Sequence, residues 1–127
     1  MFKENTRSRG RCSEQIAVDF LEKKKFQVIE RNYQIRDGEI DIIAIDQKGI
    51  WHFVEVKSKR LKSLFGLPEE AVNQKKQRKI IRTVECYLAE KGILDVLISL
   101  DVLAIDLNTW GRIVRIALYE GAFAERN

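Results

Sequence analysis

The sequence predicts one α/β domain, in which a mixed sheet of about five strands lies between helices. Three observations support this fold class. The chain has 127 residues, 45% of them hydrophobic, which suits one compact domain over residues 1–127 and is too short for two. Apolar spacing is helical, then extended over three short segments, then helical, then extended over two more. The central hairpin is apolar on both faces, so a layer of helices is needed on each side of the sheet.

The first half of the chain reads as a helix followed by three strands. Apolar residues such as Ile16 and Phe20 recur at helical spacing among charged residues in 12–25. Three short segments rich in β-branched and aromatic residues follow, and the strands are expected at 27–35, 39–46 and 50–58. The breaks between them, Arg36-Asp37-Gly38 and Gln47-Lys48-Gly49, have turn composition, so the strands should be joined by hairpins.

The second half reads as a loop, a helix and two more strands. A loop is expected at 61–67, and Pro68 followed by two glutamates is typical of a helix start. The helical spacing continues to Leu88, and Gly92 is expected to end the helix. The last two strands are expected at 94–106 and 112–118.

The positive charge is concentrated in part of the chain. The net charge is +4, but the segment 57–82 alone carries +7, from Lys57, Lys59, Arg60, Lys62, Lys75, Lys76, Arg78, Lys79 and Arg82 against two glutamates. A second basic cluster lies near the N-terminus, at Arg7, Arg9 and Arg11. Such clusters are expected of a protein that binds a phosphate backbone. A solvated helix face is an equally good reading of the charge alone.

Several classes of chemistry are disfavoured by composition. The two cysteines lie far apart with no Cys-x-x-Cys pair, so neither a disulfide framework nor a cysteine-rich zinc site is expected, and a cytoplasmic location fits best. No stretch has the length of a signal peptide core or a membrane span. The single histidine, His52, lies in an apolar segment, and no Gly-x-Ser-x-Gly elbow exists, so a buried structural role is expected for it.

The register of the second hairpin decides which side chains meet. If Gly49 is left-handed in a three-residue turn, Asp46 pairs with Ile50, and the same register places Asp41 opposite Glu55. The odd-numbered face then also carries Glu39, Ile43, Ile45, Trp51, Phe53 and Lys57. The even-numbered face carries Ile40, Ile42, Ala44, His52, Val54 and Val56. A slip of one residue would separate the two carboxylates.

Two carboxylates facing each other at about 5 Å would repel, so something must compensate them. A shared divalent cation is one explanation, because Mg²⁺ prefers carboxylate and water oxygens. A salt bridge from Lys57, on the same face, is the other, and it is the simpler reading of any isolated Glu-x-Lys. The facing aspartate in an otherwise apolar hairpin is what favours the metal site.

These residues also carry a family resemblance. The runs Gly38-Glu39-Ile40-Asp41-Ile42-Ile43-Ala44 and Phe53-Val54-Glu55-Val56-Lys57 resemble the YraN-like family of small bacterial proteins. That family is a branch of the PD-(D/E)XK nuclease superfamily, related to Holliday junction resolvases. The similarity extends over nearly the whole chain, and it implies a restriction endonuclease-like three-layer α/β/α fold, a single PD-(D/E)XK nuclease-like domain.

The resemblance implies roles for individual residues. Asp41 and Glu55 would be direct ligands of Mg²⁺ or Mn²⁺, with the Val56 carbonyl as a third ligand. Lys57 would orient the attacking water and offset charge on the scissile phosphate. Glu14, on the first helix, matches a carboxylate that holds a metal-bound water in related nucleases. Gln77 or Lys76 would contact the phosphate, and Glu39 would lie outside the metal ligands or serve only as a turn acid.

The chain departs from the family pattern at a few positions. Ser13 stands where a glycine commonly precedes the helix glutamate, and Lys25 replaces a glycine before the first strand. Ser99-Leu100-Asp101 replaces the usual Arg-Phe-Asp. None of these changes touches Asp41, Glu55 or Lys57.

The resulting expectation is a Mg²⁺-dependent endonuclease that hydrolyses DNA phosphodiester bonds and selects branched or junction DNA by shape. Nucleic-acid contacts are expected from Arg9, Arg11, Lys59, Arg60, Lys62, Lys75, Lys76, Arg78 and Lys79. One alternative is a catalytically silent nucleic-acid-binding accessory protein in repair or recombination, and another is a small interaction protein. Junction resolvases work as dimers, so a homodimer is implied as well, with a contact expected at 113–123. No membrane partner is expected.

Overall fold

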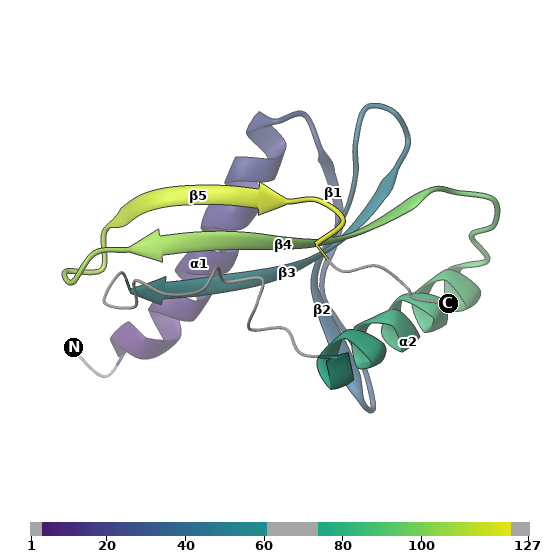
Figure 1. Ribbon diagram of the computed structural model, residues 1–127, viewed down its shortest axis with the longest axis horizontal. Coiled ribbons are helices and arrows are strands. Elements are labelled where there is room, and N and C mark those ends of the chain that lie inside the picture. Colours follow the sequence, from purple (N-terminus) through teal and green to yellow (C-terminus); the bar gives the residue numbers. More distant parts are fainter. Residues whose placement is uncertain (1–3, 61–73, 123–127) are drawn as a thin grey trace.

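The computed structural model describes residues 4–60 and 74–122, with side chains described from residue 13 onward in the first helix. The described elements follow the expected order (Figure 1): α1 (Glu4–Lys23), β1 (Gln27–Ile35), β2 (Gly38–Ile45), β3 (Trp51–Arg60), α2 (Gln74–Lys91), β4 (Ile98–Leu107) and β5 (Ile113–Tyr119). The five strands form one sheet in the order β1-β2-β3-β4-β5. Among the described strands only the β3/β4 pair is parallel, so the sheet is mixed and the predicted α/β class is confirmed.

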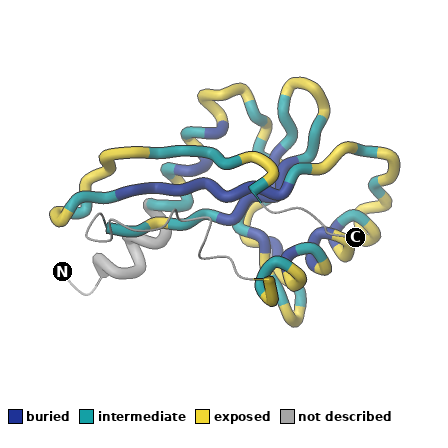
Figure 2. Tube along the Cα trace, viewed as in Figure 1, coloured by how far each residue is buried: buried dark blue, intermediate teal, exposed yellow. Residues whose placement is uncertain are grey.

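Each helix covers one face of the sheet. Ala17 and Leu21 of α1 pack on one face against Ile42, Val54 and other sheet residues. On the opposite face Ile80, Val84 and Tyr87 of α2 pack against a second cluster, which includes Ile43, Phe53 and Val102. Figure 2 shows the buried positions running through the middle of the sheet, while the turns at its rim are exposed. Neither helix, over its described length, is long and apolar enough to cross a membrane.

Most element boundaries lie within two residues of those expected, and the exceptions have local causes. Helix α1 begins at Glu4, about two turns earlier than residue 12, because its first turns are polar and carry no apolar periodicity. Strand β4 begins at Ile98 rather than residue 94. Asp95 has a positive φ of 58°, and Leu94 and Leu97 are exposed, so this connection is not extended. The expected loop 61–67 and the helix start at Pro68 lie outside the described residues.

The turn between β2 and β3 has the expected geometry. Gly49 has a φ of 85°, and its amide donates to the Asp46 carbonyl at 3.0 Å. The Asp46 amide donates to the Ile50 carbonyl at 3.0 Å, which closes the three-residue turn. Ile45 pairs with Trp51 and Ile42 with Val54, so the predicted register is confirmed. Lys25, the family's usual glycine position, also has a positive φ, of 71°.

One residue of the hairpin changes face. Strict alternation predicts Ile40 and Ile42 on the same face of the sheet. In the structure Ile42 packs under α1 and Ile40 packs under α2, so the prediction for Ile40 was wrong. The change coincides with an unusual backbone conformation in β1, where Asn32 has a positive φ of 53°. Arg31 and Asn32 both bond to Glu14 of α1, whereas Tyr33 joins the α2 cluster. The pairs Arg31–Ile42 and Tyr33–Ile40 stay in register on either side of Asn32, so the two strands change face at the same level.

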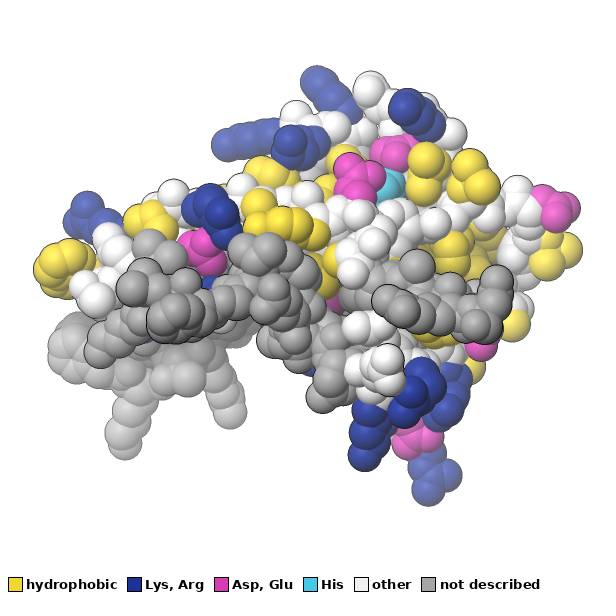
Figure 3. Space-filling view, viewed as in Figure 1, with side chains coloured by type: hydrophobic (Ala, Val, Ile, Leu, Met, Phe, Trp, Pro, Cys, Tyr) yellow, Lys and Arg dark blue, Asp and Glu magenta, His cyan; other side chains and the backbone are white. Residues whose placement is uncertain are grey.

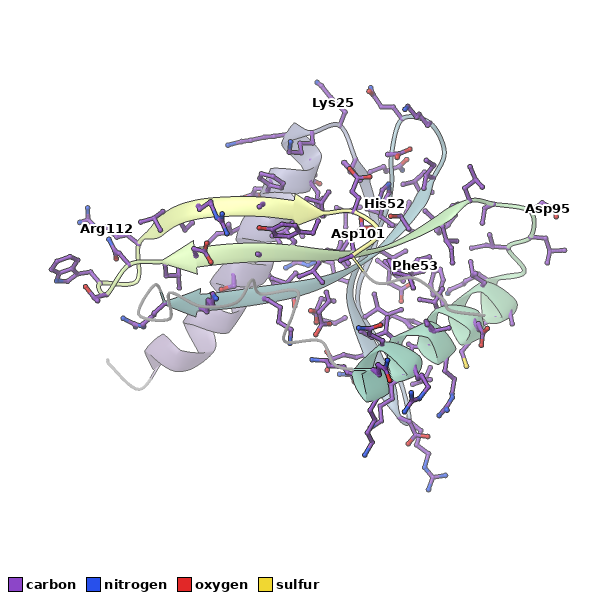
Figure 4. All side chains as sticks on the ribbon, in the orientation of Figure 1. Lys25, His52, Phe53, Asp95, Asp101 and Arg112 are labelled. Atoms are coloured by element: carbon purple, nitrogen blue, oxygen red, sulfur yellow. The ribbon has the colours of Figure 1, made fainter. Side chains whose placement is uncertain are left out.

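His52 is buried, as expected, and its ring bridges two carboxylates. Its Nδ1 lies 2.6 Å from Oδ2 of Asp101 and its Nε2 lies 2.8 Å from Oδ2 of Asp46. Figure 4 shows His52 and Asp101 side by side at the centre of the sheet. The other Asp101 oxygen accepts from the Ser99 hydroxyl at 2.5 Å and the Gly121 amide at 3.1 Å. This network joins the β2–β3 turn, two central strands and the turn after β5.

The two carboxylates change how the ring titrates. Burial lowers the pKa of His52, but the hydrogen bonds and negative charges of Asp101 and Asp46 outweigh it and raise the pKa from 6.5 to about 8. The folded protein therefore favours the imidazolium, which can donate from both nitrogens at once.

We expect stability to fall as pH rises through this range. A folded pKa above the unfolded value means that the His52 contribution is fully present below pH 6.5 and is lost as pH rises through about 8. The loss should be about 2 kcal/mol, measured by urea unfolding at pH 6 and pH 9. The His52→Gln variant should lack this part of the pH dependence, and an equal decline in both proteins would contradict the assignment.

The β1–β2 turn fixes where α2 lies. A Cβ atom added to Gly38 would lie 2.2 Å from Oγ1 of Thr83, so α2 approaches the strand more closely than any side chain allows. Gly38→Ala should therefore destabilise the protein by about 1–3 kcal/mol through overpacking. The added Thr83→Ala change removes the clashing oxygen, so the double variant should be more stable than the sum of the single effects predicts. Strict additivity in denaturant unfolding would show that the contact is not tight.

Candidate active site

The carboxylate pair lies where β2 and β3 separate. Their last paired residues toward this end are Ile42 and Val54, and the next positions are Asp41 and Glu55. The Val56 amide donates to Oδ2 of Asp41 at 2.8 Å. A side-chain oxygen of β2 therefore accepts a main-chain hydrogen bond from β3 just beyond the end of the β2/β3 ladder. Continuing on β3, Lys57 to Arg60 pair with β4 alone among the described strands. The diverging strands thus present two carboxylates together.

Asp41 is difficult to ionise in this setting. Burial raises its pKa from 3.8 to about 7, and the charges of Glu55 and Glu39 act in the same direction. The Val56 hydrogen bond lowers the pKa but does not compensate, and hydrogen bonding with Glu55 raises it further. Two carboxylates that raise one another's pKa in this way are typical of catalytic and metal sites.

Two lysines neutralise Glu55. Its Oε2 lies 3.3 Å from Nζ of Lys57 on the same strand and 2.8 Å from Nζ of Lys76 on α2. Burial and the neighbouring Lys76 lower the pKa of Lys57. Burial also lowers the pKa of Lys76, but hydrogen bonding with Glu55 and Lys57 and the negative charge of Glu55 outweigh it, so the net shift is upward. The salt bridge considered for Lys57 is therefore present, together with a second one that the sequence did not indicate.

Glu14 reaches the neighbourhood of the pair through β1. Its Oε1 accepts from Asn32 Nδ2 at 2.8 Å and from Arg31 at 3.3 Å. The pairs Arg31–Ile42 and Tyr33–Ile40 bracket Asn32, which places it beside Asp41 across the β1/β2 ladder. The described contacts of Glu14 are thus with β1, one strand away from Asp41.

The remaining candidates differ in exposure. Gln77 is half-buried next to Lys76 on α2, and Glu39 is exposed on β2. Val56 packs on the α1 side, and its amide is the group bound by Asp41. In the chain from Ser13 to Arg60 and from Gln74 to Ala122, no group of three or more histidine, cysteine, aspartate or glutamate side chains could hold a metal ion. A cation here would rely on the carboxylate pair, backbone carbonyls and water.

The basic residues form a surface on α2. Lys75, Arg78, Lys79 and Arg82 are exposed, and Figure 3 shows Lys and Arg side chains projecting together from the α2 end of the molecule. Lys76 differs from them, because it points to Glu55. At the end of β3, Arg60 donates to the Thr109 carbonyl and Lys59 is half-buried. Lys62 and the side chains of Arg9 and Arg11 lie outside the described residues.

Fold and site together define the class of protein. A mixed sheet with one helix on each face, and a carboxylate pair followed by a lysine where two strands part, is consistent with a restriction endonuclease-like fold. The sequence profile of Uncharacterised protein family UPF0102 matches residues 13–105. The chain belongs to this family, which is the YraN-like family and a member of the PD-(D/E)XK-like nuclease superfamily, so the resemblance seen in the sequence is confirmed.

Relatives in this family cover most of the chain. A UPF0102 protein of Dictyoglomus thermophilum is 40% identical over 87% of this chain and 92% of its own length. One from Alkaliphilus metalliredigens is 45% identical over 76% of this chain and 83% of its own. Among solved structures, the chain is similar to Pyrococcus furiosus SfsA in complex with Ca²⁺, at 18% identity and a TM-score of 0.36. That similarity covers 91% of this chain and 63% of the other.

The strain in the carboxylate pair predicts a stabilising substitution. Asp41→Asn keeps an acceptor for the Val56 amide and removes one of two facing charges. The pKa of Asp41 is raised to about 7 in the folded protein, so the carboxyl ionises more easily in the unfolded chain. Ionisation of Asp41 therefore lowers the free energy of unfolding as pH rises from about 4 through 7. At pH 8 the variant should be more stable to urea than the parent by at least about 1 kcal/mol. The difference should disappear near pH 4, and a less stable variant at pH 8 would contradict the assignment.

Proposed function

We propose that this protein is a Mg²⁺- or Mn²⁺-dependent endonuclease that hydrolyses DNA phosphodiester bonds, with selectivity for branched or junction DNA. The observation that carries the proposal is the pairing of Asp41 and Glu55 at the separating strands, with Lys57 on the same side of β3. Membership of a nuclease-like family supports the same chemistry.

The donor set fits a hard divalent cation. Asp41 and Glu55 supply carboxylate oxygens from facing strands, and Mg²⁺ is commonly bound by one or two carboxylates plus water and substrate phosphate. Ammonium groups already lie at Glu55, which shows that positive charge is favoured at this position. Asp41, Glu55 and the Val56 carbonyl are the proposed ligands. When bound, the cation would supply Lewis-acid stabilisation of charge on the scissile phosphate.

The chain's own groups would perform the other steps. Lys57 lies 3.3 Å from Glu55 and so stands beside the proposed ligands, where its ammonium can orient a water and offset negative charge on phosphate. The water oxygen would bond to phosphorus and lose a proton to solvent, while the bond to the leaving oxygen breaks and that oxygen takes up a proton from solvent. Gln77, on the same end of α2 as Lys76, is the proposed phosphate contact. Glu14 is the proposed outer carboxylate, one strand from Asp41.

The DNA backbone would lie across α2. Lys75, Arg78 and Lys79 are exposed there, on the same helix whose Lys76 contacts Glu55 of the carboxylate pair. Contacts of lysine and arginine with phosphate carry no sequence information, so the shape of the DNA would decide binding.

A homodimer fits the same proposal. Ile113 and Val114 of the edge strand β5 are 42% and 49% exposed, so this strand offers apolar side chains for a contact with a second copy of the chain.

One observation favours a second candidate, a catalytically silent DNA-binding accessory protein. Glu55 already has two lysine partners, and a carboxylate neutralised in this way does not need a metal. In that case the α2 surface would still bind DNA, with an affinity that falls steeply with salt.

A cleavage assay separates the two candidates. Single-stranded, duplex, flap and four-way-junction DNA are incubated with Mg²⁺ or Mn²⁺ and with the parent, Glu55→Gln or Glu85→Gln. Glu85 is an exposed glutamate of α2, so its variant matches the change in charge. We expect metal-dependent cleavage of branched DNA that falls by at least about 100-fold in Glu55→Gln only. Salt-sensitive binding of DNA by all three proteins without cleavage would favour the accessory protein.

A further inference from the structure

Lys76 makes the shorter of the two contacts with Glu55, although it comes from a different element. Its Nζ lies 2.8 Å from Oε2, against 3.3 Å for Lys57 on the same strand as Glu55. The Glu55 side chain is only 10% exposed. An ammonium delivered by α2 therefore neutralises a carboxylate that is buried and faces another carboxylate.

The Lys76 ammonium and a divalent cation would compete for the same carboxylate. Lys76 bonds to Oε2 of Glu55, and a cation held by either oxygen of that carboxylate would lie within a few ångströms of the ammonium, where two positive groups repel strongly in a partly buried site. Asp41 also attracts Lys76, so the ammonium is held by the field of both proposed ligands. The Lys76 ammonium thus supplies, beside Glu55, the positive charge that a bound divalent cation would supply.

Lys76 can leave this place more easily than Lys57. Its side chain is 42% exposed, compared with 26% for Lys57, and it lies near the first described turn of α2. A lysine stem has four rotatable carbons, so the ammonium can move to solvent without movement of the helix. Exposed Lys75 and Lys79 lie on the same helix, where a departing Lys76 would join a surface that is already basic.

We propose that Lys76 is a displaceable counter-ion that holds Glu55 in the metal-free protein and leaves when a divalent cation binds. The inference rests on the proposed function, because it takes Asp41 and Glu55 as the cation ligands. Its consequence is that Lys76 lowers the affinity of the site for metal. It also gives this lysine a role distinct from that of the DNA-binding lysines beside it.

Binding of Mn²⁺ tests this without any measurement of cleavage. Free Mn²⁺ is followed by electron paramagnetic resonance during titration of the full chain, as the parent, Lys76→Met, Lys75→Met and Glu55→Gln. Lys75 is adjacent and exposed, so its variant has the same change in net charge. We expect Lys76→Met to bind Mn²⁺ at least 10-fold more tightly than the parent, and Lys75→Met to stay within 3-fold of it.

The outcomes distinguish the inference from the proposed function. If Glu55→Gln loses Mn²⁺ binding but Lys76→Met binds no more tightly than Lys75→Met, the counter-ion role is wrong and the metal site stands. If Glu55→Gln binds as well as the parent, or if neither the parent nor Lys76→Met binds, the metal site itself is wrong. Thermal unfolding gives a second readout: without metal Lys76→Met should have a lower Tm than Lys75→Met, and saturating Mn²⁺ should remove the difference.

Discussion

The repulsion between Asp41 and Glu55 is the constraint to which the surrounding structure responds. Two carboxylates that are largely withdrawn from water and face each other must be compensated by hydrogen bonds or positive charge. The Val56 amide offsets part of the cost at Asp41, and the two lysines compensate Glu55. Lys76 can do so only because α2 lies close to the sheet, and that position requires Gly38 to have no side chain against Thr83. The close approach of α2 to Gly38 thus supports the electrostatics of the carboxylate pair on β2 and β3.

Strand β3 holds this cluster through its pairing with β4, beyond the point where its described pairing with β2 ends. It pairs with β4 along all ten of its residues, but its described pairs with β2 stop at Val54. Glu55 and Lys57 are therefore held through the backbone by β4 on one side and have no described ladder partner in β2 on the other. At the opposite end of the strand His52 bridges Asp46 and Asp101, so the buried charge there is paired and inward-facing. The same strand carries a fully buried histidine bridge at one end and a buried glutamate with partly exposed lysine partners at the other.

How far the sequence predicts this arrangement depends on whether the information is local. The Gly49 turn and the alternation of apolar residues fix the register, so the meeting of Asp41 and Glu55 follows from a few neighbouring residues. Ile40 departs from alternation at the level of Asn32, a residue of another strand, and no pattern within β2 shows it. Lys76 was grouped with the DNA-binding lysines, since nothing in a run of lysines tells which one turns inward.

His52 illustrates the same limit in a different way. Its burial could be predicted from the apolar segment around it, but its two partners come from a turn and from β4. The Ser99 hydroxyl donates a hydrogen bond to Asp101. In the sequence these two residues stood out only as part of a departure from the family pattern. Long-range polar pairs of this kind depend on the three-dimensional arrangement, which alternation and composition do not encode.

The parallel pairing of β3 with β4 has a consequence for the order in which the chain folds. That ladder joins residues 47 positions apart, such as Trp51 and Ile98, whereas β1, β2 and β3 are joined by short turns. Local hairpins close faster than long loops, so the three-stranded meander should form first. Asp41 and Glu55 meet within that meander, 14 residues apart, while Lys76 arrives only when α2 docks. During folding, Asp41 and Glu55 should therefore come together before Lys76 reaches them. The negative charge of the two carboxylates would then attract Lys76 and favour the docking of α2 on the sheet.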